Sequence, residues 1–429
     1  MPATHRLSLF SAILINVNIM LGSGIFINTV LLSKAAGSLG ALTYVIVGIL
    51  MIPLISVIAE LLKDHHGGTF YEFGKNIHPL LGFISSWGYF TAKLASAALG
   101  IHIFVTLIQK ISPTLSIINP LIIDSVIILF FSFLNMLNVR TGRSIQYVFI
   151  ILKALPILFV ILTALFYGTL HNFSYQTFLW QGIPGTLPFV LFAFAGFEAS
   201  CSLSRSIDNP EKNAPRAIFI SFFIVLIAMI MYQISFFSIL GSYLQELSSF
   251  REAFPAISQK IFSHIIWQKY ANAVTLSGIA TSSLGASYGI LFSNSWNLFT
   301  LAQHGHTIAQ NKLITLNKHH MPYICILIEA LFALGYVWFF KGEQVPLQQI
   351  SALGSTLAYT ISVCAFTISA FYVYKNKRIL ACAGILTCLL LLLATARNAL
   401  LFGIYAYALY STIILIGLVM YFITASIRD

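Results

Sequence analysis

The chain has 429 residues, of which 58% are hydrophobic and only 8% are charged, with a mean hydropathy of +0.89. A soluble domain carries about 25% charged residues, so the composition excludes a soluble globular protein and predicts an all-α polytopic membrane protein. The formal net charge of +11 does not require a nucleic-acid partner, because cytoplasmic loops of membrane proteins are rich in Lys and Arg.

Apolar segments long enough to cross a bilayer, about 20 residues each, recur along the whole chain. Twelve such spans are expected, at 8–30, 40–62, 80–108, 119–138, 145–168, 184–204, 216–240, 272–300, 322–340, 350–373, 379–395 and 402–425. The first is too long for a signal sequence, and no small-residue cleavage site follows it, so we expect it to be retained. The loops are short apart from 241–271, which leaves no room for a soluble catalytic domain.

The distribution of Lys and Arg predicts the orientation of the chain. With the N-terminus inside, 14 of the 23 Lys and Arg residues fall on the cytoplasmic side, 7 fall outside, and Lys93 and Lys153 remain within spans. This bias follows the positive-inside rule. It predicts that both termini are cytoplasmic. The compact loops and short termini favour a bacterial inner membrane.

The first span is interrupted in its middle, where residues 16–28 read NVNIMLGSGIFIN. Each glycine in a helix interior costs about 1 kcal/mol relative to alanine. An unwound stretch in hydrocarbon survives only where it lines protein or a water-filled cavity. The interruption is therefore either a close helix-packing contact or a ligand site made of freed backbone groups.

The sixth span carries a second interruption at the matching place. Gly196 is flanked by phenylalanines, and an acid, Glu198, follows inside the apolar run. Interrupted helices at matching positions of two halves are typical of inverted-repeat transporters. The chain is thus expected to be one transport domain over 1–429, with a first five-helix repeat at 8–168, an inverted second repeat at 184–373 and two extra helices at 379–425.

The two interruptions predict complementary chemistry. N–H groups near Ser23, Gly24 and Ile25 would lie at the positive end of a half-helix, which suits a carboxylate. Freed carbonyls near Ala193, Phe194 and Ala195 would accept hydrogen bonds from an ammonium group. Two such breaks that face each other make a receptor for a zwitterion.

Four motifs in order carry a resemblance to a known family: GSGIF at 22–26, AELLKDHHGGTFYEFG at 59–74, NVRTGRSIQYVFIILK at 138–153 and FAFAGFEASCSLSRSIDNPEKNAPRAI at 192–218. Over nearly its whole length the chain resembles the amino acid–polyamine–organocation (APC) permeases, which share the leucine-transporter fold. The resemblance implies proton-coupled symport or exchange of amino acids by alternating access.

The resemblance also implies roles for individual residues. Phe192 matches an aromatic residue that caps the substrate, and Lys153 matches a lysine that replaces a sodium ion and is linked to proton coupling. The expected substrate-binding residues are Gly22, Ser23, Gly24, Ile25, Phe192, Ala193, Phe194, Ala195, Gly196 and Lys93, and the expected coupling or gating residues are Lys153 and Glu198. The chain departs from the family at Arg205 and Ser206, where acids are usual, and in the loop HHGG at 65–68.

Ionisable groups inside spans are costly and need a partner or a water-lined role. Lys153 either snorkels to the interface or serves coupling, and Glu198 is either bonded to neighbouring backbone or proton-sensitive. Lys93 would favour an anionic substrate near the pocket, or it is neutralised by Glu198 or Glu329. Glu329 is expected to face away from the site.

No metal or cofactor is expected. The five cysteines form no metal-ligand spacing and are interpreted as buried hydrophobes. The histidines of 304–320 and the pair His65–His66 are interpreted as solvated loops without a nearby carboxylate. Hydroxyls in TSSLGASYGILFSNS at 281–295 serve helix packing; they could also bind sodium, but Lys153 competes for that place, so protons are favoured over sodium.

Other functions remain as alternatives at this point. A membrane enzyme is disfavoured because only His102 lies within a span, without a visible partner, and a channel because no ring of like charges appears. A sensor or non-transporting subunit with the same fold stays open, as does a carrier of polyamines or other organic cations.

Overall fold

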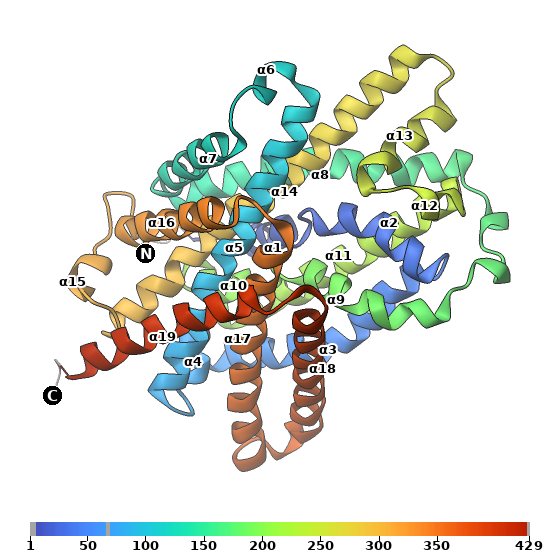
Figure 1. The fold of residues 1–429 in the computed structure, drawn as a ribbon. Helices are drawn as coiled ribbons and strands as arrows, with labels where there is room; N and C mark the ends of the chain where they lie inside the picture. The colour runs from blue at the N-terminus through green and yellow to red at the C-terminus, as the bar shows by residue number, and fades with distance from the viewer. Residues whose placement is uncertain (1–5, 66–68, 427–429) are drawn as a thin grey trace.

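The computed structural model describes residues 6–65 and 69–426, and every regular element in these ranges is a helix (Figure 1). The long helices are α3 (Gly40–Asp64), α5 (Pro79–Ile111), α7 (Pro120–Asn135), α8 (Val139–Tyr167), α11 (Pro210–Leu240), α14 (Ile265–Gln303), α16 (Tyr323–Phe340), α17 (Gln344–Tyr372), α18 (Arg378–Phe402) and α19 (Tyr405–Ser426). Short helices connect them: α4 (Phe70–Gly74), α6 (Pro113–Ser116), α12 (Tyr243–Glu246), α13 (Phe250–Ile261) and α15 (Gln310–Leu313). His66, Gly67 and Gly68 of the HHGG loop lie outside the described residues.

The helices confirm an all-α polytopic membrane protein. Within the described ranges, 8 helices are long and apolar enough to cross a membrane, or up to 10 if each of two bent pairs is one span. The other two expected spans coincide with α7, which is short, and with α14, whose many hydroxyl and amide side chains make it more polar. The count of twelve spans, the inverted repeat and the orientation therefore stay predictions.

Both expected interruptions are real breaks. The first span consists of α1 (Leu9–Met20) and α2 (Gly24–Ala36), which meet at 47°. The sixth consists of α9 (Ile183–Phe194) and α10 (Ala199–Leu203), which are separated by non-helical backbone at Ala195 and Gly196. In the interior of the bundle, α2 packs beside α9 and α1 beside α10 (Figure 1).

The most extensive packing joins α5 to α14 and α17, and α11 to α3. Glycines permit close approaches along α14: a Cβ at Gly289 would lie 2.4 Å from Cγ1 of Ile19, and one at Gly285 would lie 2.7 Å from Cβ of Phe149. Small residues at such contacts let membrane helices approach and gain van der Waals packing. The predicted packing role of the small residues at 281–295 is confirmed at these two glycines.

A cluster of polar contacts closes the end of the bundle that the sequence predicts to be cytoplasmic. His304 Nε2 lies 2.8 Å from Glu72 Oε1, and Lys75 Nζ lies 2.5 Å from Glu72 Oε2. His306 is buried and its Nε2 lies 2.8 Å from the Tyr71 hydroxyl. The expectation of a solvated loop without a carboxylate is therefore wrong for His304 and His306, because the tertiary fold brings α4 against them.

Arg205 joins this end of the bundle as well. Its guanidinium donates to the side-chain carbonyl of Gln303. An amide from α14 thus partners the residue that stands where the family usually has an acid. The Arg205 guanidinium is therefore paired with a neutral amide at this contact and not with a carboxylate.

We expect the Glu72 cluster to make stability dependent on acid. Burial raises the pKa of Glu72, but hydrogen bonds from His304 and Lys75 and their charges outweigh it and bring the pKa from 4.5 to about 2. A carboxyl whose pKa is depressed on folding stabilises the folded state above its unfolded pKa and loses that contribution as pH falls through the folded value. The wild-type melting temperature in detergent should therefore fall between pH 4.5 and about 2 more steeply than that of Glu72→Gln.

The matched control for this measurement is Glu246→Gln, since Glu246 is exposed. Its melting temperature should follow the wild type across the whole titration. Equal acid sensitivity of the wild type and Glu72→Gln would contradict the stabilising role of the cluster.

Candidate functional site

The break in the first span leaves backbone donors without acceptors. The Gly22 N–H donates to the Met20 carbonyl at 2.9 Å, and helix α2 restarts with the N–H groups of Phe26 and Ile27 donating to the Ser23 carbonyl. Within the described part of the chain, no acceptor is found for the N–H groups of Ser23, Gly24 and Ile25. These donors lie at the positive end of the α2 dipole, where an anionic group is stabilised.

The carbonyls on the other side of this break are satisfied by two side chains. Lys153 of α8 is buried, and its Nζ donates to the carbonyls of Asn18 at 2.6 Å and Leu21 at 2.7 Å. The Ser282 hydroxyl of α14 donates to the same Leu21 carbonyl at 2.7 Å. Lys153 therefore does not snorkel to the interface; it pairs with the end of α1.

The break in the sixth span leaves acceptors without donors. Ala195 leaves helical geometry with ψ 132°, and Gly196 has φ +124°, a backbone conformation that side chains with a Cβ rarely adopt. Within the ranges that the structure describes, the carbonyls of Ala193, Phe194 and Ala195 accept no hydrogen bond. The geometry thus provides the acceptors that the sequence predicted for an ammonium group.

The two breaks face each other across a cavity of about 50 Å³. A Cβ at Gly24 would lie 3.1 Å from Cα and Cβ of Ala193, so the breaks nearly touch at this point. The cavity is lined by Ile19, Met20, Gly22, Ser23, Gly24, Lys93, Ser96, Leu99, Gly100, Phe192, Ala193, Ala195, Ser283, Ala286, Ser287 and Ile290. Of the predicted substrate-binding residues, Ile25, Phe194 and Gly196 do not line it.

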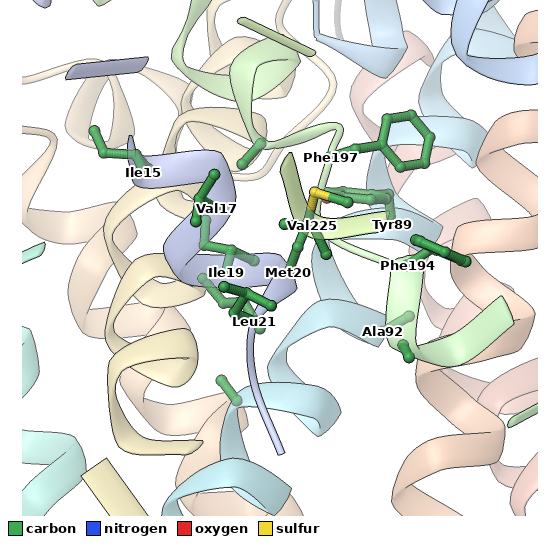
Figure 2. Close-up of a cluster of buried hydrophobic side chains, with 14 of the residues drawn as sticks. Ile15, Val17, Ile19, Met20, Leu21, Tyr89, Ala92, Phe194, Phe197 and Val225 are labelled. Atoms are coloured by element: carbon green, nitrogen blue, oxygen red, sulfur yellow. The ribbon is translucent and has the colours of Figure 1, made fainter. Parts of the chain in front are cut away.

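Apolar side chains surround the end of α1. Figure 2 shows Ile19, Met20 and Leu21 gathered with Tyr89 of α5 and Phe194 of α9. These side chains are buried, so the unpaired backbone groups lie in a region of low dielectric, where hydrogen bonds and ion pairs are stronger than in water. The site is therefore suited to bind a small polar molecule through few contacts.

Lys93 and Glu198 form a buried ion pair beside the second break. Lys93 Nζ lies 2.7 Å from Glu198 Oε1, with side-chain exposures of 4% and 0%. The Tyr89 hydroxyl donates to Oε1 at 3.0 Å, and the Gly196 N–H donates to Oε2 at 2.8 Å. Of the two neutralising partners considered for Lys93, the structure selects Glu198. Glu329 is buried in α16 and lines none of the cavities described here.

Two larger cavities lead away from the site toward the end predicted to be extracellular. A cavity of about 150 Å³ shares Phe192 and Ala195 with the inner cavity. An outer vestibule of about 890 Å³ shares Ile27, Leu31, Phe189 and Gln344 with the middle cavity. Phe192 thus lines both the inner and the middle cavity, and its role as a cap stays a prediction.

Several site residues were not predicted individually. Ser282 and Ser283 belong to the hydroxyl-rich run at 281–295, whereas Ser96 and Gly100 of α5 belong to no motif in the sequence. Tyr89 is one of 19 tyrosines. Its contact with Glu198 spans 109 positions in the chain, so only the fold could have revealed it.

The described residues contain no group of three or more His, Cys, Asp or Glu side chains that could hold a metal ion. The expectation that His102 has no partner is wrong, because its Nδ1 lies 2.7 Å from Asp124 Oδ2 of α7. This pair lines none of the three connected cavities.

Comparison with known proteins points in one direction. Residues 7–424 match the family described as amino acid permease. The chain is 25% identical over 326 residues to the aromatic amino acid transport protein AroP of Salmonella typhimurium, which covers 72% of this chain and 69% of the relative. It is 24% identical over 459 residues to the branched-chain amino acid permease BcaP of Bacillus subtilis, covering 98% and 92%. It is also 24% identical over 398 residues to the D-serine/D-alanine/glycine transporter of Escherichia coli, covering 85% and 79%.

We expect Gly196→Ala to destabilise the protein. A Cβ at position 196 would lie 2.7 Å from Cγ2 of Ile19, and φ +124° is strained for any residue with a Cβ, so the loss should exceed about 1 kcal/mol. The measurement is thermal unfolding in detergent. Gly335→Ala is the control, because nothing lies within 4 Å of the place that its methyl group would take. An unchanged melting temperature for Gly196→Ala would contradict the broken-helix geometry.

Proposed function

This chain belongs to the amino acid permease family of the APC superfamily, a family of membrane transporters, and we propose that it carries an amino acid by alternating access around the two helix breaks. The observation that supports this most is the placement of free N–H groups at Ser23 and Gly24 opposite free carbonyls at Ala193 and Ala195, four residues that line the inner cavity. An α-carboxylate and an α-ammonium would satisfy these two sets together.

The wall of the inner cavity supports a substrate with a small side chain. Its wall includes the small residues Ser96, Gly100, Ser283, Ala286 and Ser287, and the larger side chains of Ile19, Met20, Lys93, Leu99, Phe192 and Ile290 fill the rest. A volume of about 50 Å³ has room for only a few waters. A large aromatic side chain would need the wall or the Phe192 cap to move.

Lys153 supports coupling to protons rather than sodium. Its ammonium already contacts the Asn18 and Leu21 carbonyls, with the Ser282 carbonyl at 3.4 Å. Carbonyl and hydroxyl oxygens of this kind would otherwise suit a cation. Loss of the proton from Lys153 would leave a neutral amine with two N–H groups, so its hydrogen bonds to the end of α1 would lose their charge assistance, which links protonation to the conformation of the break.

The packing supports a division into two moving parts. The first and sixth spans contact each other and the second and seventh (α3 and α11), whereas α5, α7, α14 and α16 pack together. Rocking of the first group against the second would open the site to alternate sides. The vestibule on the outer side and the polar contacts at the other end fit a state that is open outward, in a multi-pass protein of a bacterial inner membrane with both termini cytoplasmic.

Counterflow in proteoliposomes tests the proposal. Vesicles loaded with a mixture of unlabelled amino acids should accumulate one labelled amino acid with a small neutral side chain. Gly24→Leu should abolish this accumulation while the protein still folds, because the added side chain would push Ala193 away. Gly335→Leu, at an open position of α16, should retain it.

Either of two results would overturn the proposal. Retained accumulation by Gly24→Leu would exclude the backbone site. The absence of counterflow for every labelled amino acid, from folded wild-type protein, would favour the alternatives of a sensor, a non-transporting subunit or another substrate class.

We expect Lys153→Ala to remove the dependence of transport on a pH gradient, since it removes the ionisable group at the break. The measurement is initial uptake rate with and without a pH gradient. Lys269→Ala is the control, because Lys269 is exposed at the start of α14. An unchanged pH profile for Lys153→Ala would remove Lys153 from the coupling mechanism.

A further inference from the structure

We propose that Lys93 is a specificity-determining residue that excludes cationic substrates, because its ammonium occupies the place beside Glu198 that a substrate cation would take. The inference rests on the proposed function, since it assigns a charge preference to the same cavity. With this preference, the cavity would accept amino acids with uncharged or acidic side chains and exclude lysine-like amino acids and polyamines.

The position of Lys93 carries the argument. It lines the inner cavity, whereas Glu198, its partner at 2.7 Å, does not and is fully buried. Lys93 therefore stands between the substrate space and the carboxylate. A positively charged side chain in the cavity would meet the ammonium first and could not reach Glu198.

The surroundings of Glu198 make this arrangement hard to replace. Oε1 accepts from Tyr89 and Oε2 from the Gly196 N–H, and Lys93 is the one basic side chain that forms an ion pair with it among the described residues. A buried carboxylate that loses its counter-charge is strongly unfavourable. Without Lys93, a cation entering from the cavity would be the nearest available partner.

The charges along the access route agree with this preference. The vestibule is lined by Lys34, Arg251 and Arg397, and the inner cavity by Lys93. Within the part of the chain that the structure describes, no acidic side chain lines the vestibule, the middle cavity or the inner cavity. Fixed charges of one sign along a cleft repel ions of the same sign and raise the local concentration of the opposite one.

The test is inhibition of counterflow by cationic amino acids. In wild-type proteoliposomes that accumulate a labelled neutral amino acid, a 100-fold excess of unlabelled lysine, ornithine or putrescine should leave the accumulation unchanged. Lys93→Met keeps most of the side-chain length but removes the charge. We expect at least a tenfold lower inhibitory concentration for these cations in this variant.

Two further variants separate specificity from structure. Lys93→Arg keeps the charge and should still exclude cations. The double variant Lys93→Met/Glu198→Gln removes both charges and should return to the wild-type response, because no carboxylate remains to attract a cation. An equal increase in sensitivity to inhibition by cations in the single and the double variant would overturn the proposal. The absence of any such increase in Lys93→Met would overturn it as well.

A direct measurement keeps the test independent of the variants. Wild-type protein that transports lysine or putrescine as well as neutral amino acids overturns the inference while it leaves the proposed function in place. Wild-type protein that transports no amino acid overturns the proposed function itself. If Lys93→Met transports too little, thermal stabilisation in detergent by lysine reports binding; stabilisation of this variant but not of the wild type is the expected result, and its absence counts against the inference.

Discussion

The need to satisfy backbone polar groups away from water is the constraint on which the rest of this structure depends. A break in a membrane helix exposes groups that cost several kcal/mol each when unpaired in hydrocarbon. At the first break, Lys153 and Ser282 donate hydrogen bonds to the carbonyls at the end of α1. Because that side of the break is stabilised from within, the donors at the start of α2 remain available to a ligand.

The second break is fixed by a different means. Glu198 reaches back to the Gly196 N–H, and its charge is balanced by Lys93 from α5. One ion pair thus joins the helix that bends to a helix of the surrounding scaffold. At the first break, the Lys153 ammonium donates to backbone carbonyls; at the second, the Glu198 carboxylate of the Lys93–Glu198 ion pair accepts from a backbone N–H. These contacts join the first span to α8 and α14 and the sixth span to α5.

The contacts that stabilise the two breaks join the first and sixth spans to other helices. The first and sixth spans carry the free backbone groups, while the side chains that stabilise the breaks come largely from other helices. In the mechanism that we propose, a change in protonation or occupancy at the site would therefore change the contacts between these spans and α5, α8 and α14. Polar contacts of Glu72, Tyr71 and Arg205 close one end of the bundle, whereas the vestibule lies at the other end.

The sequence by itself determined the membrane class, the approximate helix positions and the two breaks, because hydropathy and the placement of Gly24, Gly196 and Glu198 are local properties of the chain. It also marked Lys93 and Lys153 as charges that need a reason to lie within spans. Only the tertiary structure decided their partners: Lys93 with Glu198 rather than Glu329, Lys153 with α1 rather than the interface, and His304 with Glu72. These contacts join residues more than 100 positions apart. Their strength depends on distance and burial, which no local pattern of residues specifies.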